Sequence, residues 1–429
     1  MGRRFLAVSR PVTIRLDGAT LVANEGEPLA AALVGAGIDT IARSPKFHRP
    51  RGATCMRGGC DGCVVRVDGV PNVLGCLEPC REGMVVETQN RMGPREFDLL
   101  RANDWFFPSG MNHHEVFIGV PGAEPFLRVF ARRISGLGHL PDDPVPVVTG
   151  ARRAVTVLVL GGGAAGLAAA VAFAEAGARV ELVDEHTGIQ AVRERHAGEE
   201  LVRVDALLAR VEALAAEGRV EVRARTKAVG IFSGLVLLEG AAGAEVLDAA
   251  LTVLATGAHD GPAIFEGNDL PGVYSLRAAR RLVAAGVAPG KRVVVVVDPS
   301  VGERVKHVAE ALAAELTGAN TPCVVHTGRV TKAHGSSHVK KVTLVDAQAT
   351  EHVLPADALV VEGPRSPSFE LAQQAGASVV RTKSGFAVPP DALGGRFAVV
   401  GEITGASPDV AAFESRAREL AASWREASR

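Results

Sequence analysis

The chain has 429 residues, of which 47% are hydrophobic, 22% are charged and 4% are aromatic, and its formal net charge at pH 7 is −1. This length allows two or three domains, and the apolar content supports a buried core and excludes an intrinsically disordered protein. The balanced charge gives no basis for binding nucleic acid or an anionic membrane surface. The N-terminal sequence has no apolar run long enough for a signal peptide, so a cytoplasmic protein is expected.

The first 92 residues predict a small β-rich domain with the β-grasp fold of ferredoxins. Asp-Gly pairs at 17–18 and 68–69 lie between apolar stretches, which is the signal of a β-hairpin turn. Between the hairpins, Pro28 suits the first turn of a helix. The stretch 83–89 predicts one further strand. Two hairpins, one helix and a late strand are the elements of a β-grasp.

Four cysteines of this domain have the spacing of a [2Fe-2S] cluster. Cys55, Cys60 and Cys63 form the pattern C-x4-C-x2-C, and Cys76 follows after the second hairpin. Two irons share four thiolates, so one loop must deliver three of them from the same side. Glycines between these cysteines allow the backbone to curl with positive φ and to bring amide N–H groups close to the cluster. The predicted cluster ligands are therefore these four cysteines.

A zinc ion and disulfide bonds are the alternatives for these cysteines. A zinc site with four cysteines usually uses two C-x2-C pairs, and this sequence has only one. Disulfides are rare in cytoplasmic proteins. The two remaining cysteines, Cys80 and Cys323, are expected to be buried thiols without a chemical role.

Residues 93–150 have no clear hydrophobic period, and their aromatic content predicts a connector that packs on another part of the chain. His113 and His114 are adjacent there, and neighbouring side chains of a strand point to opposite faces. A metal ion shared by these two histidines is therefore not expected.

Beyond the connector, strands and helices alternate, which predicts a parallel sheet. Gly161, Gly163 and Gly166 form the fingerprint G-x-G-x-x-G between a strand and a helix. The first glycine permits the turn, the second lets a pyrophosphate approach, and the third packs the helix on the strand. Asp184 ends the next strand, where an acid binds ribose hydroxyls. The uncharged run 155–174 is interrupted by these glycines, so we do not interpret it as a transmembrane helix.

Two later segments resemble FAD-contacting segments of two-domain flavoproteins of the glutathione reductase type. They are "LTVLATGA", which ends at 258, and "FAVVGEITG", in which Glu402 stands where Asp is usual. Glutamate keeps the acceptor oxygen on a longer side chain. In the wider flavoprotein family a glutamine follows the acid that ends the second strand, and Gln190 matches it after "TGI". The candidate dinucleotide-binding residues are Gly161, Gly163, Ala164, Ala165, Gly166, Asp184, Glu185, Gln190, Ala255, Thr256, Gly257, Gly401 and Glu402.

The expected fold is α/β, with a ferredoxin-like β-grasp followed by a flavoprotein fold with two dinucleotide-binding domains. The expected parts are the β-grasp at 1–92, the connector at 93–150, an FAD-binding Rossmann-like domain at 151–272 and 356–429, and an NAD-binding-like domain at 273–355. The last of these is expected to be degenerate.

The degeneracy follows from the loop after the strand "RVVVVV". Asp298, Pro299 and Ser300 stand where the glycines of a nucleotide-binding loop belong. This pattern favours a structural domain that has lost NAD(P)H binding. No C-x2-C pair lies near the first nucleotide site, so disulfide reductase chemistry is not expected either.

The order of these segments resembles the α subunit of heteromeric sarcosine oxidase. The segments that carry the resemblance are 43–52, 85–91, 97–110, 158–186 and 254–282, with "FAVVGEITG" near the end. The chain differs from that subunit because it keeps the four cluster cysteines and stops after the nucleotide-binding half. Both differences bring it nearer to hydrogen cyanide synthase, opine and octopine dehydrogenases, and dye-linked proline or hydroxyproline dehydrogenases.

The resemblance implies the electron-transfer subunit of an amine or imino-acid dehydrogenase or oxidase. An FAD-containing β subunit would oxidise the C–N bond of sarcosine, glycine, proline, hydroxyproline or an opine, and further small subunits are an option. Electrons would pass through the cluster and an FAD held here to an acceptor. In relatives the same site holds NAD or ATP, and the fingerprint does not distinguish these from FAD.

The sequence contains no convincing catalytic acid, base or nucleophile, and no transmembrane segment is expected. A basic run beside the cluster is either a solvated loop, a docking surface or a phosphate grip for FMN at a subunit interface. The alternatives for the whole chain are an NAD(P)H-dependent flavin and [2Fe-2S] reductase and a scaffold subunit with a structural nucleotide. The basic run comprises Arg43, Lys46, Arg49, Arg51 and Arg57.

Overall fold

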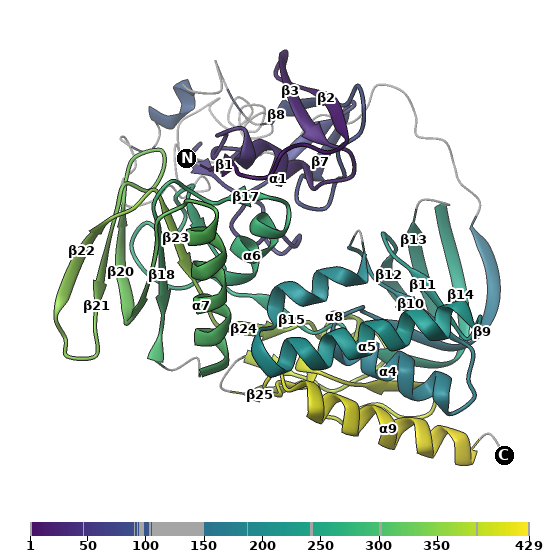
Figure 1. Ribbon diagram of the computed structural model, residues 1–429. Coiled ribbons are helices and arrows are strands. Elements are labelled where there is room, and N and C mark those ends of the chain that lie inside the picture. Colours follow the sequence, from purple (N-terminus) through teal and green to yellow (C-terminus); the bar gives the residue numbers. More distant parts are fainter. Residues whose placement is uncertain are drawn as a thin grey trace, which may run out of the picture. The chain divides into compact units, whose positions relative to one another are not determined.

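The structure, a computed structural model, divides into two compact units (Figure 1). Unit 1 comprises Met1–Val145 and Ala263–Glu362, and unit 2 comprises Pro146–Pro262 and Gly363–Arg429. The described residues are 2–45, 47–89, 91, 93, 98–102, 104, 150–186, 188–240, 243–299, 303–382 and 385–427.

This division places the predicted β-grasp and the predicted NAD-binding-like segment together in unit 1. The second of these covers 263–362 in the unit, whereas the sequence predicted 273–355. Most of the predicted connector, with His113 and His114, lies outside the described residues. The division into four parts therefore stays a prediction.

The N-terminal part of unit 1 is the predicted β-grasp. Its sheet has the order β3-β2-β8-β6-β7, with β2 and β8 parallel and the other neighbours antiparallel. Both Asp-Gly turns have positive φ at both residues, as a type I′ turn requires. Helix α1 (Leu29–Gly35) begins after Pro28 and buries six consecutive side chains. The strands are β2 (Pro11–Leu16), β3 (Ala19–Asn24), β6 (Val64–Val67), β7 (Val70–Leu74) and β8 (Val85–Thr88).

The second part of unit 1 has a parallel sheet in the order β16-β23-β18-β19 and an antiparallel sheet in the order β20-β21-β22. All five valines of β18 are buried, because strands of a parallel sheet are covered on both faces. The helices here are α6 (Leu276–Ala284) and α7 (Glu303–Gly318). The strands are β16 (Val273–Tyr274), β18 (Val293–Val297), β19 (Cys323–Thr327), β20 (Arg329–His334), β21 (Lys341–Val345), β22 (Glu351–Pro355) and β23 (Ala358–Val361).

One pair of short strands joins the two parts of unit 1, and a second pair lies within the first part. The first described residues form β1 (Arg3–Arg4), which pairs with β17 (Val287–Ala288) after helix α6. The strands β4 (Ala42–Arg43) and β5 (Pro50–Arg51) pair with each other just before the cysteine loop. A short 3₁₀ helix, η1 (Leu99–Ala102), follows the β-grasp.

Unit 2 is built on a seven-stranded sheet in the order β11-β10-β9-β14-β13-β12, in which β27 also pairs with β14. The long strand β14 pairs with the antiparallel β13 along its first half and with the parallel β27 along its last three residues. The strands are β9 (Ala151–Leu160), β10 (Val180–Val183), β11 (Val220–Arg223), β12 (Lys227–Phe232), β13 (Leu235–Gly240), β14 (Gly243–Leu254) and β27 (Phe397–Val399).

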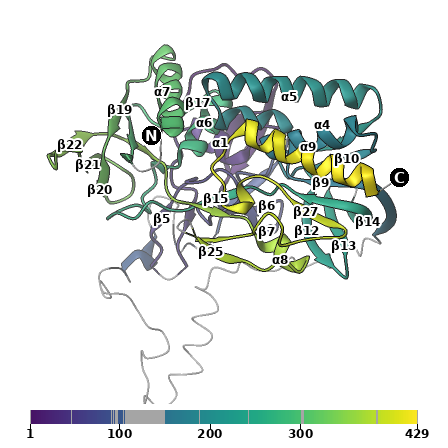
Figure 2. The same cartoon turned by 90° about the horizontal axis from the view of Figure 1, so that it is seen from below.

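Three helices cover one face of this sheet, namely α4 (Ala164–Glu175), α5 (Gly198–Ala216) and α9 (Val410–Ala427) (Figure 2). The charged segment "VAAFESRARELAASWREA" near the end of the sequence predicts a terminal helix, and it forms α9 residue for residue. The other face packs against α8 (Glu370–Gln374) and against residues that follow it, which include Ala377, Val388 and Ile403. The remaining short strands of this unit are β15 (Ala258–Asp260), β24 (Arg365–Pro367), β25 (Val380–Thr382) and β26 (Gly385–Ala387).

The uncharged run that could have been taken for a membrane helix forms β9 and α4, as the interrupting glycines predict. Over the part of the chain that the structure describes, no helix combines the length and the apolar character needed to cross a membrane. The α/β fold with an N-terminal β-grasp is confirmed.

Packing between α4 and α9 yields a prediction for the stability of unit 2. Phe173 of α4 is fully buried, and its ring meets the ring of Trp424 edge-on with centroids 6.0 Å apart. Phe173→Ala should lower the free energy of unfolding by about 3–5 kcal/mol, because it opens a cavity between the helices. Urea unfolding followed by circular dichroism measures this loss.

Val202→Ala is the matched control, because it also removes apolar atoms from a helix but at a side chain that is 69% exposed. It should change the free energy of unfolding by less than about 0.5 kcal/mol. Equal effects of the two substitutions would contradict the packing described for α4 and α9.

Candidate functional site

The four predicted cluster cysteines lie together in unit 1. Cys55, Cys63 and Cys76 are buried, and Cys60 is partly exposed. The sulfur of Cys55 shares hydrogen bonds with those of Cys60 and Cys76, and Cys76 also contacts Cys63. The loop and the following hairpin thus bring four soft sulfur donors into mutual contact.

The backbone around these sulfurs is shaped for close approach. The N–H of Arg57 donates to Cys55 Sγ at 3.4 Å, and that of Gly58 donates to Cys76 Sγ at 3.2 Å. Gly58 has φ +76°, and a Cβ on Gly62 would lie 1.9 Å from the carbonyl oxygen of Gly52. N–H donors that point at sulfur are a feature of iron–sulfur sites. The donor set and the backbone therefore fit a cluster.

The crowding of the thiols has an electrostatic consequence. Hydrogen bonds from Cys60 and Cys76 lower the pKa of Cys55 to about 2. The hydrogen bond to Cys55, together with burial, raises the pKa of both Cys60 and Cys76 above the usual thiol range. The four sulfurs can all be thiolates only when a bound cation offsets their mutual repulsion.

Zinc and a [2Fe-2S] cluster differ in how they distribute their ligands. Among the described residues, no three His, Cys, Asp or Glu side chains are arranged as ligands of one ion. Tetrahedral zinc needs such an arrangement, whereas a [2Fe-2S] cluster distributes its ligands over two irons. Burial raises the pKa of Cys80 to about 12 and that of Cys323 to about 11, so both stay neutral thiols.

The cysteine loop is anchored to the second part of unit 1. The N–H of Ser275 donates to the carbonyl oxygen of Thr54 at 2.9 Å. A Cβ on Gly52 would lie 3.1 Å from the Cα of Pro271. The segment that the sequence assigned to a degenerate nucleotide-binding domain therefore supports the loop that carries the cysteines.

That degenerate segment does not present a phosphate-binding loop in its described residues. Strand β18 is followed by Asp298 and Pro299, and Ser300 lies outside the described residues. Helix α7 begins with Glu303 in its first turn. A negative charge at this position opposes a bound phosphate, since a helix N-terminus attracts anions through its free N–H groups.

The basic run before the cysteine loop is largely paired with acids of the same unit. Arg43 is buried against Asp98, with 3.6 Å between Nε and Oδ2. Arg51 pairs with Asp269 at 2.5 Å. Lys46 lies outside the described residues. The hypothesis of a free basic surface for docking or for an FMN phosphate is weakened by these pairs.

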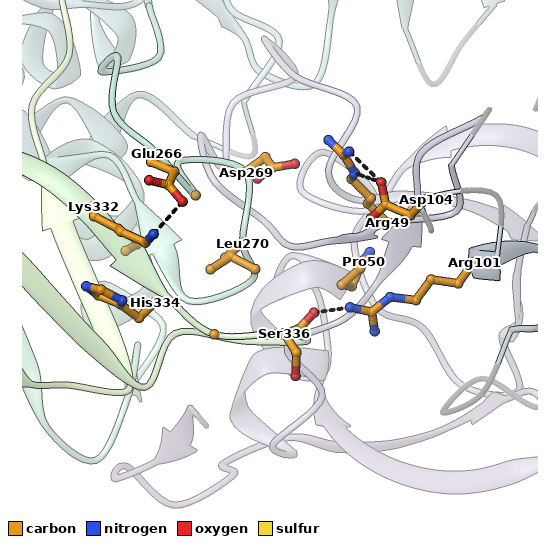
Figure 3. A pocket seen from close by; sticks show the side chains of 13 residues that line it. Arg49, Pro50, Arg101, Asp104, Glu266, Asp269, Leu270, Lys332, His334 and Ser336 are labelled. Carbon is orange, nitrogen blue, oxygen red and sulfur yellow. Dashed lines mark hydrogen bonds and ion pairs between the residues drawn. The ribbon is translucent and has the colours of Figure 1, made fainter. Parts of the chain in front are cut away.

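Arg49 of the same run lines a pocket of about 580 Å³ in unit 1 (Figure 3). Its Nε donates to Asp104 at 2.9 Å, and its guanidinium lies over the ring of Phe47. On the other side of the pocket, Lys332 pairs with Glu266 at 2.5 Å. Figure 3 shows that these pairs stand at the pocket wall, so the described charges there balance one another.

In unit 2 the glycine fingerprint has the geometry that a dinucleotide site needs. Gly161 has φ +107°, and a Cβ there would lie 2.3 Å from the carbonyl oxygen of Ala255. A Cβ on Gly166 would lie 1.8 Å from the carbonyl oxygen of Gly161. Gly163 precedes α4, and neither a side-chain cap nor an acidic residue in the first turn is found there. Gly161 and Gly166 therefore make the turn and the close packing that the fingerprint predicts, and binding of a pyrophosphate at Gly163 stays a prediction.

The second and third predicted segments meet this loop. Gly257 has φ +73° and follows Thr256, whose hydroxyl donates to the carbonyl oxygen of Ser368 at 2.7 Å. A Cβ on Gly401 would lie 2.6 Å from the Cβ of Ala165 in the first turn of α4. Three segments that are far apart in the sequence therefore surround the N-terminus of one helix.

Asp184 is bound to the glycine loop itself. Its Oδ2 accepts the N–H of Gly162 at 2.6 Å, and its Oδ1 accepts the ring Nδ1 of His186 at 2.7 Å. Burial alone would raise the pKa of Asp184, but the hydrogen bonds from His186 and Gly162 hold it at about 2. The carboxylate therefore stays ionised and stabilises the loop, in addition to the ribose-binding role that the sequence predicts for it.

The last predicted site residues differ in orientation. Glu185 is exposed, and so is Gln190, whose amide donates to Glu212 at 2.7 Å. Glu402 is 9% exposed and forms ion pairs with two arginines of unit 2, Arg365 and Arg195. The carboxylate of Glu402 is thus inside the site, whereas the amide of Gln190 is engaged outside it.

Arg195 is a residue that the sequence motifs did not indicate. It ends the 3₁₀ helix η2 (Ile189–Arg195), in which residues three apart lie on one face. Ile189 and Val192 share that face and are buried in the core. The spacing I-x-x-V-x-x-R is the signal that places the guanidinium inward.

Comparison with known proteins supports the cluster and the fold. Residues 9–91 match a family described as a 2Fe-2S iron-sulfur cluster binding domain. Sarcosine oxidase subunit alpha of Rhizobium meliloti (strain 1021) is 28% identical over 455 aligned residues, which cover 96% of this chain and 46% of that subunit. Hydrogen cyanide synthase subunit HcnA of Pseudomonas aeruginosa is 34% identical over 85 residues, which cover 20% of this chain and 81% of that subunit.

Nearly the whole chain is therefore similar to the first part of the sarcosine oxidase α subunits, and this similarity supports the resemblance that the sequence segments indicate. The chain spans about half the length of the sarcosine oxidase subunits that it matches. The crystal structure of L-proline dehydrogenase from P. horikoshii has the same fold, with a TM-score of 0.72 over 99% of this chain and 75% of that one, at 22% identity. The predicted two-part fold, a [2Fe-2S] domain followed by a dinucleotide-binding fold, is confirmed.

The low pKa of Asp184 predicts a pH-dependent contribution to the stability of this protein. The pKa is lower in the folded state, at about 2, than the usual 3.8, so the contribution is present above that usual value. It is lost as the pH falls from about 4 towards 2. Asp184→Asn should therefore cost about 2 kcal/mol at pH 7 and progressively less in acid.

Thermal unfolding midpoints of the wild type and of Asp184→Asn between pH 7 and pH 3 measure this difference. Glu185→Gln is the control, because Glu185 is the exposed neighbour, and it should leave the pH dependence unchanged. A constant gap between wild type and Asp184→Asn over the whole range would contradict the prediction.

Proposed function

We propose that this chain is the electron-transfer (α-type) subunit of a heteromeric flavin and iron–sulfur amine or imino-acid dehydrogenase or oxidase. The observation that carries the proposal is the union, in one chain, of a [2Fe-2S] domain with a dinucleotide-binding unit. When bound, the cluster supplies one-electron chemistry and a flavin supplies one- or two-electron chemistry, so the pair can connect the two regimes.

The proposed cluster ligands are Cys55, Cys60, Cys63 and Cys76. Their support is the spacing, the mutual contacts of the sulfurs and the N–H groups that point at two of them. Burial of the sulfurs keeps water away from the site, and the glycines of the loop leave room for the backbone to wrap around it.

FAD is the proposed occupant of the dinucleotide site in unit 2, with NAD and ATP as the alternatives. The uncapped helix N-terminus behind Gly163 suits the phosphates of all three. FAD is favoured because Gly401 lies against Ala165, which adds a third segment to the site as in two-domain flavoproteins. The proposed cofactor contacts come from the three converging segments 161–166, 255–257 and 401–402.

The proposed partner is an FAD-containing β subunit that oxidises the C–N bond. Proteins similar to this chain are subunits of sarcosine oxidase and of hydrogen cyanide synthase, and a protein with the same fold is an L-proline dehydrogenase. The substrate class therefore comprises sarcosine, glycine, proline, hydroxyproline and opines. An FMN held at the subunit interface receives less support, because Arg43, Arg49 and Arg51 already pair with acids.

An NAD(P)H-dependent reductase is the competing function. It needs a working phosphate loop after β18, and the acidic first turn of α7 opposes one. A scaffold subunit with a structural nucleotide is the other alternative. The proposal keeps the expected cytoplasmic location, since an oxidising compartment would convert thiols as crowded as these into disulfides.

Cofactor content tests the proposal on the purified chain, prepared without oxygen. Two irons and one FAD per chain are expected, from an iron assay and chromatography of the released nucleotide. Alanine at any of the four proposed ligands should remove the visible and EPR signals of the cluster, because an incomplete ligand set does not hold two irons. Cys80→Ala and Cys323→Ala are the controls and should retain those signals.

A cluster that survives loss of one of the four cysteines, or zinc in place of iron, would overturn the proposed ligands. Reduction of bound flavin by NADH alone would favour the reductase. Reduction only after addition of the β subunit and an amine substrate supports the electron-transfer subunit, and failure of that mixture to reduce any centre here would favour the scaffold.

A further inference from the structure

The guanidinium of Arg195 stands where the three segments of the dinucleotide site meet. Its Nη1 is 3.9 Å from the position that a Cβ would take on Gly163, and 3.9 Å from the corresponding position on Gly257. The same atom is 3.8 Å from Oε2 of Glu402. One cationic group therefore borders the glycine loop, the second segment and the third.

This guanidinium retains hydrogen-bonding capacity. Its Nη2 is buried and has no hydrogen-bond partner among the described residues. The side chain of Arg195 is 16% exposed, so it is largely withdrawn from solvent. A buried donor without a partner is costly, and an anionic ligand that accepts from it removes that cost.

The backbone of η2 determines why Arg195 points inward. Residues three apart eclipse in a 3₁₀ helix, so Arg195 follows Ile189 and Val192, both of which are buried. Gln190 and Arg193 form the next row and lie on the exposed side, where they contact each other. The two arginines of one short helix thus have opposite orientations.

Glu402 is engaged by cations on both of its oxygens. Arg365 binds Oε1, and Arg195 approaches Oε2. Arg365 comes from β24, which pairs with β15 directly after Gly257. Glu402 thus holds Arg195 beside a helix N-terminus with no acid in its first turn.

We infer that Arg195 binds the diphosphate of the dinucleotide and that Glu402 is a positioning residue that holds Arg195 in place. This inference rests on the proposed function, because it takes the site in unit 2 as a dinucleotide site. Arginine suits a diphosphate because its planar group can donate two parallel hydrogen bonds to phosphate oxygens. Glu402 then acts through Arg195, whereas the sequence motif assigned it to direct contact with the cofactor.

The test is the dissociation constant for FAD of the full chain with its cluster, after mild removal of bound nucleotide, followed by quenching of flavin fluorescence. Arg195→Gln should weaken binding about 10- to 100-fold, because a charge-assisted contact to phosphate is lost. Arg193→Gln is the matched control from the exposed side of the same helix, and it should stay within about 2-fold of the wild type.

Variants of Glu402 separate positioning from direct contact. Glu402→Gln should weaken binding of FAD in the wild-type background and have no further effect in the Arg195→Gln background. Additive effects of the two substitutions would overturn the positioning role, since residues that act as one unit are not additive. Arg195→Lys keeps the positive charge but loses the planar group that donates two parallel hydrogen bonds, so it should lose an intermediate amount of affinity for FAD. This variant preserves the test if Arg195→Gln does not fold.

If Arg195 binds the diphosphate, its substitution should weaken binding of every ligand that carries one and should leave the stability of the empty protein unchanged. ADP binding should fall with FAD binding in Arg195→Gln, and the thermal unfolding midpoint without nucleotide should change little. Equal affinity of the wild type and both Arg195 variants for FAD would overturn the inference and leave the proposed function intact. Binding of ADP or ATP without FAD would overturn the proposed cofactor, and the role of Arg195 would then stand or fall with the loss of ADP affinity in Arg195→Gln. Absence of all nucleotide binding would overturn both.

Discussion

Close approach of backbone segments is the constraint on which both halves of this protein depend. In unit 2, α4 can pack against β9 and β14 only because Gly161 and Gly166 carry no side chain, since a Cβ at either position would overlap a carbonyl oxygen. In unit 1, Gly62 crosses Gly52 under the same restriction. In each case the tight crossing brings backbone N–H groups to the position where a negatively charged ligand is expected. The glycines therefore determine the backbone geometry of both sites, independently of the side chains that line them.

Charge is distributed differently around the two sites. Near the cysteine loop, Arg49 and Arg51 pair with acids that belong to other parts of unit 1. These ion pairs neutralise positive charge that is evident in the sequence. In the candidate dinucleotide site, Arg195 and Arg365 share the largely buried carboxylate of Glu402. The low pKa of Asp184 belongs to the same site, because its carboxylate is held by His186 and by the glycine loop. The run of basic residues in the sequence therefore overstates the positive charge that is left for an anion, because folding pairs three of its arginines with acids.

The association of the β-grasp with 263–362 also gives the degenerate nucleotide-binding segment a physical role. It contributes Ser275 and Pro271 to the support of the cysteine loop, and its strand β17 pairs with the first residues of the chain. A segment without a phosphate-binding loop can therefore still be needed for the packing contacts that it makes with the β-grasp. This accounts for the buried valine strand β18, which has the character of a nucleotide-binding strand but is not followed by a glycine fingerprint.

Local chemistry let the sequence by itself determine the hairpins at Asp17-Gly18 and Asp68-Gly69, the extent of α9, the C-x4-C-x2-C loop and the glycine turn after β9. Each depends on neighbours within a few residues, so spacing and residue type suffice. Only the tertiary structure decided that β27 joins β14, that the chain divides at 263 and 362, and that Glu402 pairs with Arg195 and Arg365. These features depend on contacts between residues far apart in the chain, and on whether a charge finds a partner after folding, which no local pattern records.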